Sequence, residues 1–197
     1  MDILTRVAAL VGCYLIASVS LSVLYSRSRG EDIRTNDFAG ASGMVRRYGW
    51  VVGLSIAVGD VLKGVLAVLP VYFLATDWLW LAPAVVVLGH CYPIWHGWVG
   101  GQGVAPATGA MYGIDPLLGG VTMLSGLGFM GLHKVLKLKP YVKLGAVPFS
   151  AIITLLLMLV VAGSRYGLTG LGGIGLVILV MGVRGLQVLR SPPPSKV

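Results

Sequence analysis

Apolar residues dominate this chain in long runs, and short polar segments separate one run from the next. The runs cover roughly residues 3–25, 50–74, 80–95, 103–114, 117–133, 144–163 and 167–188. A helix needs about 20 residues at about 1.5 Å each to cross a bilayer, and the first, second, sixth and seventh runs reach that length. Asp115-Pro116 separates the fourth run from the fifth, because a residue before proline avoids the helical region. These two runs are therefore two short helices or one broken helix.

Basic residues between the runs indicate how the chain is oriented. With seven spans and the N-terminus outside, one side of the membrane receives Arg27, Arg29, Arg34, Arg46, Arg47, Lys134, Lys137, Lys139, Lys143, Arg190 and Lys196. The loops on the opposite side hold Asp77, Asp115 and Arg165. Cytoplasmic loops of membrane proteins carry an excess of Lys and Arg. The sequence therefore predicts an all-α polytopic membrane protein of about seven transmembrane helices, with its N-terminus outside and its C-terminus cytoplasmic.

The composition agrees with one membrane domain and excludes a soluble one. Of the 197 residues, 56% are hydrophobic and 11% are charged, and the mean hydropathy is +0.88. A soluble domain carries about 25% charged residues. The net charge of +8 comes from the basic loops and gives no reason to expect nucleic acid. We expect residues 1–190 to form a single integral-membrane domain and residues 191–197 to be a disordered cytoplasmic tail.

Loop 26–48 is the first polar segment with candidate chemistry. It is rich in arginine, small residues and turn formers. Guanidinium groups and backbone N–H groups of such a loop can surround a phosphate. An ordinary basic loop has the same composition, so these residues alone leave both readings open.

Asp60 and Lys63 form the second candidate, one turn apart on the predicted helix 50–74. Asp60 lies about 15 Å along that helix, near the centre of the bilayer, where an ionisable side chain is costly and indicates function by default. At this spacing the two charges partly neutralise each other. A structural ion pair between helices is the alternative.

The third candidate is the segment GHCYPIWHGWVGGQGVA at residues 89–105. Its glycines allow the backbone to approach a ligand and to point successive N–H groups at an anion. His90 stands near the inner end of a span, where it can meet a phosphate or serve as a hydrogen-bonded structural residue. We interpret His96 as interfacial. With two cysteines at different predicted depths (Cys13 and Cys91), the sequence favours neither a disulfide nor a metal site.

Taken in chain order, these three segments resemble the bacterial acyl-phosphate glycerol-3-phosphate acyltransferases of the PlsY type. The positions that fit the motifs of that family are Asp32, Ile33, Arg34, Gly40, Ala41, Ser42, Arg46, Asp60, Lys63, Gly64, Gly89, His90, Pro93, Gly100, Gly101, Gly103, Val104 and Ala105. The sequence departs from the family where Val99 and Gln102 replace two lysines of the glycine-rich loop. Arg184 is what remains of a polar C-terminal pattern.

The resemblance implies transfer of a fatty acyl group from acyl-phosphate to glycerol 3-phosphate in phospholipid synthesis, without a metal or other cofactor. It implies an inner-membrane protein with a cytoplasmic active site and an acyl-phosphate-producing enzyme as a possible partner. The catalytic candidates are His90, Asp60 and Lys63, of which the last two are expected to shape the site rather than to transfer protons. The candidates for substrate binding are Arg34, Ser42, Arg46, Gly100, Gly101, Gln102 and Gly103.

Two other functions are compatible with the sequence. The replaced lysines are consistent with a catalytically degenerate relative that binds lipid or a partner protein. A small transporter with Asp60 and Lys63 in its path is the third possibility.

Overall fold

A computed structural model describes residues 2–190, and the secondary structure of this part of the chain is entirely helical. The elements are α1 (Ile3–Ala17), α2 (Leu21–Ser28), α3 (Ile33–Asn36), α4 (Ala41–Tyr48), α5 (Trp50–Leu74), η1 (Thr76–Leu81), α6 (Ala82–Cys91), η2 (Ile94–His96), α7 (Val104–Ile114), α8 (Pro116–Val135), α9 (Lys139–Val142) and α10 (Ala146–Arg190). The tail predicted to be disordered, 191–197, lies outside the described residues.

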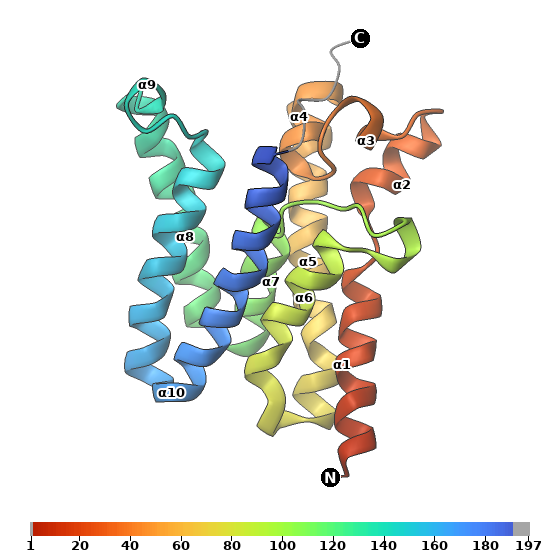
Figure 1. The fold of residues 1–197 in the computed structure, drawn as a ribbon, viewed down its shortest axis with the longest axis vertical. Coiled ribbons are helices and arrows are strands. Elements are labelled where there is room, and N and C mark those ends of the chain that lie inside the picture. The colour runs from red at the N-terminus through yellow and green to blue at the C-terminus, as the bar shows by residue number, and fades with distance from the viewer. Residues whose placement is uncertain (1, 191–197) are drawn as a thin grey trace.

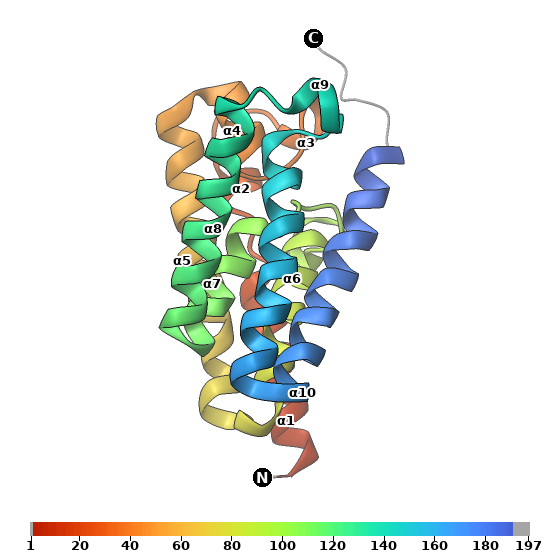
Figure 2. The same ribbon diagram turned by 90° about the vertical axis from the view of Figure 1, so that its left-hand side faces the viewer.

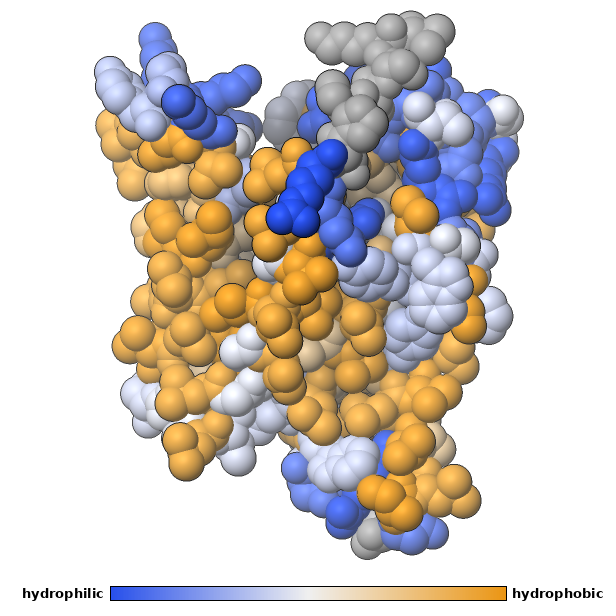
Figure 3. All heavy atoms as spheres, in the orientation of Figure 1, coloured by the Kyte–Doolittle hydropathy of each residue, from blue (hydrophilic) through white to orange (hydrophobic). Residues whose placement is uncertain are grey.

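The long helices run side by side (Figures 1 and 2). The N-terminus lies at one end of the molecule. The helix α10 ends near the opposite end, where α2, α3, α4 and α9 also lie. Figure 3 shows hydrophobic residues around the middle of the visible face and hydrophilic residues gathered at both ends. Large apolar side chains also project from single helices, among them Val51, Leu54, Leu62 and Phe73 of α5. This distribution suits a protein surrounded by lipid.

Four segments of the described chain have the length and apolar character needed to cross a membrane. They are Ile3–Ser28, Trp50–Leu74, Thr76–His96 and Ala146–Arg190. The last segment holds two helices that meet at Gly167, whose backbone angles (φ 60°, ψ −140°) suit glycine and turn the chain back on itself (Figure 1). The predicted runs 144–163 and 167–188 correspond to these two halves.

The helix boundaries follow local signals in the sequence. Asp115 ends α7 in an extended conformation and accepts the Leu117 N–H at 2.8 Å, and Pro116 is the first residue of α8. A cap of this kind satisfies an N–H group that a helix start otherwise leaves free. Residues 103–133 are therefore two helices, which resolves the alternative left open by the sequence.

Two of the predicted runs are less regular than expected. Run 3–25 is divided by residues 18–20 into α1 and α2, and run 80–95 contains α6 between two 3₁₀ turns. The break in the first run was not predicted because residues 18–20 are serine and valine, which have no strong helix-breaking tendency.

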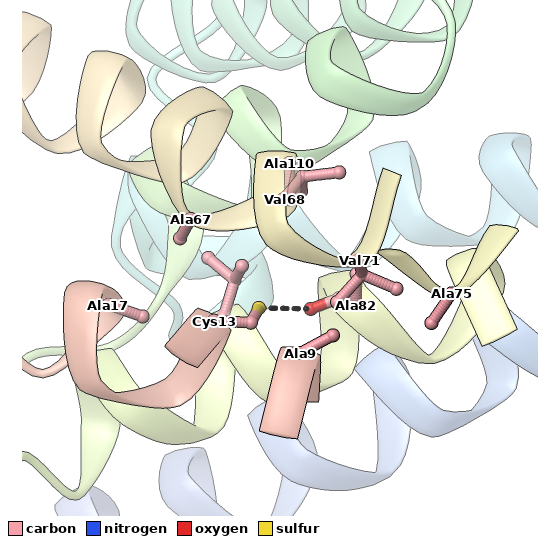
Figure 4. Packing of buried hydrophobic residues seen from close by; sticks show 10 residues of the cluster. Ala9, Cys13, Ala17, Ala67, Val68, Val71, Ala75, Ala82 and Ala110 are labelled. Atoms are coloured by element: carbon pink, nitrogen blue, oxygen red, sulfur yellow. Dashed lines mark hydrogen bonds between the residues drawn. The ribbon is translucent and has the colours of Figure 1, made fainter. Parts of the chain in front are cut away.

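Small residues form the core between α1, α5, α6 and α7. Figure 4 shows this cluster, which contains Ala9, Cys13, Ala17, Ala67, Val68, Val71, Ala75, Ala82 and Ala110. The Cys13 thiol points at the Ala82 carbonyl, with 3.8 Å between sulfur and oxygen. Both cysteines are buried and unbonded to each other. Small side chains let helices approach closely where lipid weakens the hydrophobic drive for association.

The closest helix contact joins α5 to α7 through two glycines. A Cβ atom on Gly64 would lie 2.3 Å from the Pro106 carbonyl oxygen, and one on Gly109 would lie 1.9 Å from the Val61 carbonyl oxygen. The rigid backbone cannot accommodate either atom. This contact sets the position of α7 against the helix that carries Asp60 and Lys63.

We predict that Gly109→Ala destabilises the protein by about 1–3 kcal/mol, because the added methyl group forces α5 and α7 apart. Thermal unfolding in detergent measures the effect. Gly120→Ala in α8 is the matched control, since no atom lies within 4 Å of its Cβ position. Equal melting temperatures for the two variants would contradict the close contact.

Candidate active site

A buried group of three polar side chains lies between α5 and α6. The Lys63 ammonium is 3.1 Å from Asp60 Oδ1 and 3.1 Å from His90 Nδ1, and the side chains of all three residues are at most 7% exposed. The spacing of Asp60 and Lys63 brings them to one face of α5. The three residues named as catalytic candidates from the sequence therefore meet in space.

The break between α1 and α2 belongs to the same cluster. Lys63 donates a hydrogen bond of 2.6 Å to the Val19 carbonyl oxygen, which lies in that break. The helix α6 packs tightly on α1 just before His90, because a Cβ atom on Gly89 would be 2.7 Å from the Tyr14 carbonyl oxygen. Lys63 thus links three segments of the chain and satisfies a backbone acceptor that an interrupted helix would leave free.

The glycine-rich loop 97–103 folds back over His90. The N–H groups of Gly100 and Gly101 donate to the carbonyls of Cys91 (3.0 Å) and His90 (3.2 Å), at the end of α6. A Cβ atom on Gly101 would be 2.2 Å from His90 Nε2 and 2.9 Å from the Ala39 carbonyl oxygen. Glycine at 101 is therefore what allows the loop, the histidine and the first polar loop to touch.

Two of the four candidate positions in this loop keep a free backbone N–H group. The N–H groups of Gly100 and Gly101, expected to face a phosphate, are already bonded to α6. The N–H groups of Gln102 and Gly103 find no backbone acceptor within residues 2–190. Gly103 has a left-handed conformation (φ 85°) and starts α7, so an anion here would also meet the positive end of a helix.

Arg34 ties the first polar loop to the glycine-rich loop. Its guanidinium donates to the carbonyl oxygens of His96 and, at 3.2 Å, of Val99. Asp32 caps α3 and binds the same guanidinium at 2.8 and 2.6 Å. These hydrogen bonds from Arg34 hold the pKa of Asp32 well below its usual range, and Asp32 in turn raises the pKa of Arg34.

Ser42 and Arg46 belong to α4, and neither side chain bonds to the cluster of Asp60, Lys63 and His90. Arg46 binds Asp37 at 2.7 and 2.6 Å and is 57% exposed, and Ser42 is also exposed. Within the described residues, no hydrogen bond joins either side chain to loop 97–103. Burial acts to raise the pKa of Asp37, but the Arg46 and Phe38 hydrogen bonds outweigh it and leave this pKa lowered.

Glu31 is the third acid of this loop and binds two partners from α4. Arg47 donates to it at 3.0 and 2.6 Å, and the Tyr48 hydroxyl donates a further short hydrogen bond. The hydrogen bonds from Arg47 and Tyr48 lower the pKa of Glu31 from 4.5 to about 2. Burial, with the hydrogen bond to Glu31, raises the pKa of Tyr48 to about 12.

Sequence reasoning did not foresee the burial of His96 and left Arg184 without a place in the site. His96, interpreted as interfacial, is the last residue of the apolar segment Thr76–His96 and is buried within the protein, with 7% of its surface exposed. Arg184 reaches across from the second half of α10 and bonds to two carbonyls of the glycine-rich loop. The signal for Arg184 was present, since it is the one charged residue between Tyr166 and Arg190.

No metal site is evident in the described part of the chain, where no three His, Cys, Asp or Glu side chains converge. The arrangement instead places cations and backbone N–H groups around one buried histidine. Such a site is chemically suited to an anion.

Comparison with known proteins identifies the family. Residues 7–184 match the profile of the family described as Glycerol-3-phosphate acyltransferase. The chain belongs to this family. A family protein of Deinococcus radiodurans, Glycerol-3-phosphate acyltransferase 2, is 39% identical over 184 residues, which are 90% of this chain and 91% of the relative. The Glycerol-3-phosphate acyltransferase of Geobacter metallireducens is 39% identical over 118 residues, 58% of this chain and 61% of the relative.

Solved structures of the family have the same fold. One is PlsY (YgiH), an integral membrane glycerol 3-phosphate acyltransferase in its glycerol 3-phosphate form, with a TM-score of 0.69 and 25% identity, covering 95% of this chain and 94% of that one. The lysphosphatidic acid form of PlsY gives a TM-score of 0.72 at 24% identity, covering 97% and 96%. The resemblance noted in the sequence is confirmed, and an integral membrane fold with it.

We predict that Lys63→Met destabilises the protein by about 3–5 kcal/mol, because it leaves the Asp60 carboxylate buried without its cation. Thermal unfolding in detergent measures the loss. The double variant Asp60→Asn/Lys63→Met removes both charges and is expected to recover most of it. A single variant as stable as the parent would show that the pair does not hold the helices.

The Glu31 carboxyl is predicted to titrate near pH 2. Because its pKa is lowered from 4.5, its hydrogen bonds contribute their full stabilisation above pH 4.5, and this is lost as the pH falls through about 2. Glu31 is the one glutamate of the sequence, so carbon-13 labelling of glutamate gives a single titration curve by NMR. Arg47→Gln is expected to move the midpoint up towards 4.5.

Arg29→Gln is the control for this titration, since Arg29 contacts the Tyr25 ring and hydroxyl rather than a carboxylate. A midpoint near 4.5 in the parent chain would contradict the pairing of Glu31 with Arg47.

Proposed function

We propose that this protein transfers a fatty acyl group from acyl-phosphate to the 1-hydroxyl of glycerol 3-phosphate. The products are lysophosphatidate and inorganic phosphate, at the entry step of phospholipid synthesis. Membership of the glycerol-3-phosphate acyltransferase family supports the acceptor and the reaction class. The acyl-phosphate donor rests on the motif resemblance described above.

The observation that carries the proposal is the meeting of three sequence segments around His90. Asp60 and Lys63 come from α5, the glycine-rich loop lies on the His90 ring, and Arg34 joins that loop to the first polar loop. A mixed-anhydride donor and a phosphomonoester acceptor together bring several negative charges into one site. Cations and preorganised N–H donors are the groups that stabilise such charges.

The proposed chemistry needs positioning and charge stabilisation more than a strong base. The hydroxyl oxygen of glycerol 3-phosphate attacks the acyl carbonyl carbon, the bond from that carbon to the phosphate oxygen breaks, and phosphate leaves. The hydroxyl proton passes to an oxygen of the departing phosphate. We assign Arg34 and the N–H groups of Gln102 and Gly103 to the phosphate oxygens, with Ser42 and Arg46 as outer contacts.

Asp60 and Lys63 are proposed to hold His90 rather than to exchange protons with the substrate. Lys63 is bonded to Val19 and His90 and paired with Asp60, which leaves its ammonium fully engaged. His90, whose Nε2 side faces Gly101, orients the glycine-rich loop. The parts of this network act as a unit, so each is needed for the loop geometry.

We further propose seven membrane crossings, with the N-terminus outside and the active site facing the cytoplasm. The two halves of α10 at Gly167 supply two crossings, since 45 residues are about twice the length needed. The basic residues of loop 26–48 and of the α8–α10 connection then share the cytoplasmic side. An acyl-phosphate-producing enzyme can deliver its product at that face.

Acyl transfer by the purified protein tests the reaction. With palmitoyl-phosphate and labelled glycerol 3-phosphate, the parent is expected to form lysophosphatidate. His90→Ala, Arg34→Ala and Gly101→Val are each expected to lower the rate by about 100-fold or more, because each disturbs the loop that holds the anion.

Arg29→Ala is the control for the acyl-transfer series, as an arginine of the same polar loop outside the proposed site. Formation of lysophosphatidate only from a thioester donor would overturn the donor assignment. Binding of glycerol 3-phosphate without turnover, from any donor, would favour a degenerate relative instead.

The orientation is tested with single cysteines introduced after Cys13 and Cys91 are changed to serine. In intact cells, a membrane-impermeant thiol reagent is expected to label Asp77→Cys and to spare Lys137→Cys until the membrane is opened. Labelling of both, or the reverse pattern, would contradict the proposed topology.

A further inference from the structure

Arg184 makes an unusual pair of hydrogen bonds, because both go to neutral carbonyls. Its Nε donates to the Gly101 oxygen at 3.0 Å, and Nη2 donates to the Gly100 oxygen at 2.6 Å. The guanidinium also lies 5.7 Å from the centre of the Tyr92 ring, and the Tyr92 hydroxyl donates to Gln187 of the same helix at 2.8 Å. The second half of α10 is thus attached to the glycine-rich loop and to Tyr92 at the end of α6.

These bonds decide the direction of the next peptide group. A planar trans peptide points its C=O and N–H in opposite directions, and the described chain has no cis peptide. Since the Gly101 carbonyl faces Arg184, the Gln102 N–H faces the other way. Gly101 has no side chain to keep this peptide from turning over. Arg184 therefore fixes the direction of the free Gln102 N–H group.

Arg184 is also the cation of the site that no acid neutralises. Within residues 2–190, the other arginines of the site region pair with carboxylates: Arg27 and Arg34 with Asp32, Arg46 with Asp37, and Arg47 with Glu31. Lys63 pairs with Asp60. Of the remaining acids, Asp2 caps α1, Asp77 pairs with Arg6, and Asp115 pairs with Arg165. No side-chain carboxylate in this part of the chain is left for Arg184.

The glycine-rich loop needs such a cation from elsewhere. Residues 97–103, GWVGGQG, contain no positive charge. A guanidinium has five N–H donors, and the loop carbonyls use two of them. The other three N–H groups, one on Nη2 and two on Nη1, have no acceptor among the described residues. Arg184 therefore combines an uncompensated charge with free donors at the edge of the loop.

We propose that Arg184 is the phosphate-positioning residue of this chain: by binding the Gly101 carbonyl it holds the Gly101–Gln102 peptide with its N–H towards the anion, and its positive charge polarises that peptide from the opposite side. This inference rests on the proposed function and names a residue outside the three segments from which the site candidates were drawn. The ligand chemistry it fits is a phosphomonoester dianion, such as that of glycerol 3-phosphate, beside a helix start.

The test compares Arg184→Gln and Arg184→Lys with Arg190→Gln, an exposed arginine of the same helix outside the site. The full chain in detergent is used to measure acyl transfer, calorimetric binding of glycerol 3-phosphate and thermal stability. We expect Arg184→Gln to lower kcat/KM by about 100-fold and to weaken glycerol 3-phosphate binding by about tenfold, with the melting temperature nearly unchanged. Arg184→Lys keeps the positive charge but cannot bind both loop carbonyls at once. Compared with Arg184→Gln, it should therefore restore part of the glycerol 3-phosphate binding and a smaller part of kcat. Arg190→Gln should match the parent.

Each outcome decides the proposal. Parental binding and turnover in Arg184→Gln would overturn it, as would a fall in stability in both Arg184 variants with no advantage for lysine. A parent chain that binds glycerol 3-phosphate but transfers no acyl group overturns the proposed function, and binding in the variants then decides the role of Arg184. A parent that does not bind glycerol 3-phosphate overturns both.

Discussion

The buried ammonium of Lys63 is the interaction on which the rest of the site depends. It contacts the Val19 carbonyl, the Asp60 carboxylate and the His90 ring within 3.1 Å. A buried charge is tolerated only where its partners are fixed, so this contact requires α1, α5 and α6 to meet in one arrangement. The break between α1 and α2 then has a physical reason, since the interrupted helix supplies the carbonyl that completes the shell of Lys63.

A second set of contacts holds the glycine-rich loop against the cluster of Lys63, Asp60 and His90. The end of α6 accepts the N–H groups of Gly100 and Gly101, Arg34 holds the start of the loop, and Arg184 holds its middle. Each contact involves backbone atoms of the loop. Its shape therefore depends on three distant segments, while its own side chains contribute little. Glycine at 100 and 101 is the condition for that, because a Cβ atom at either position would collide with His90.

The ion pairs of the first polar loop show how a basic protein can leave few of its cations free. Glu31, Asp32 and Asp37 occupy four of the guanidinium groups of loop 26–48, those of Arg27, Arg34, Arg46 and Arg47. A phosphate that reaches these arginines must share them with, or displace, a carboxylate. Arg184 differs because it meets carbonyl oxygens and the Tyr92 ring but no carboxylate in the described residues, so its full charge acts on the site. The number of arginines in the sequence is thus a poor guide to the charge available for a ligand.

The sequence by itself determined the helical membrane class, most helix positions and the family, because apolar length, proline and glycine signals and the spaced motifs are local. It also selected Asp60, Lys63 and His90, since ionisable residues in apolar runs are unusual. Only the tertiary structure decided which N–H groups of the loop stay free, that His96 is buried, and that Arg184 meets Gly100 and Gly101 across more than 80 residues. Those features depend on the direction of single peptide groups and on packing between distant helices, and no local pattern of residues records either.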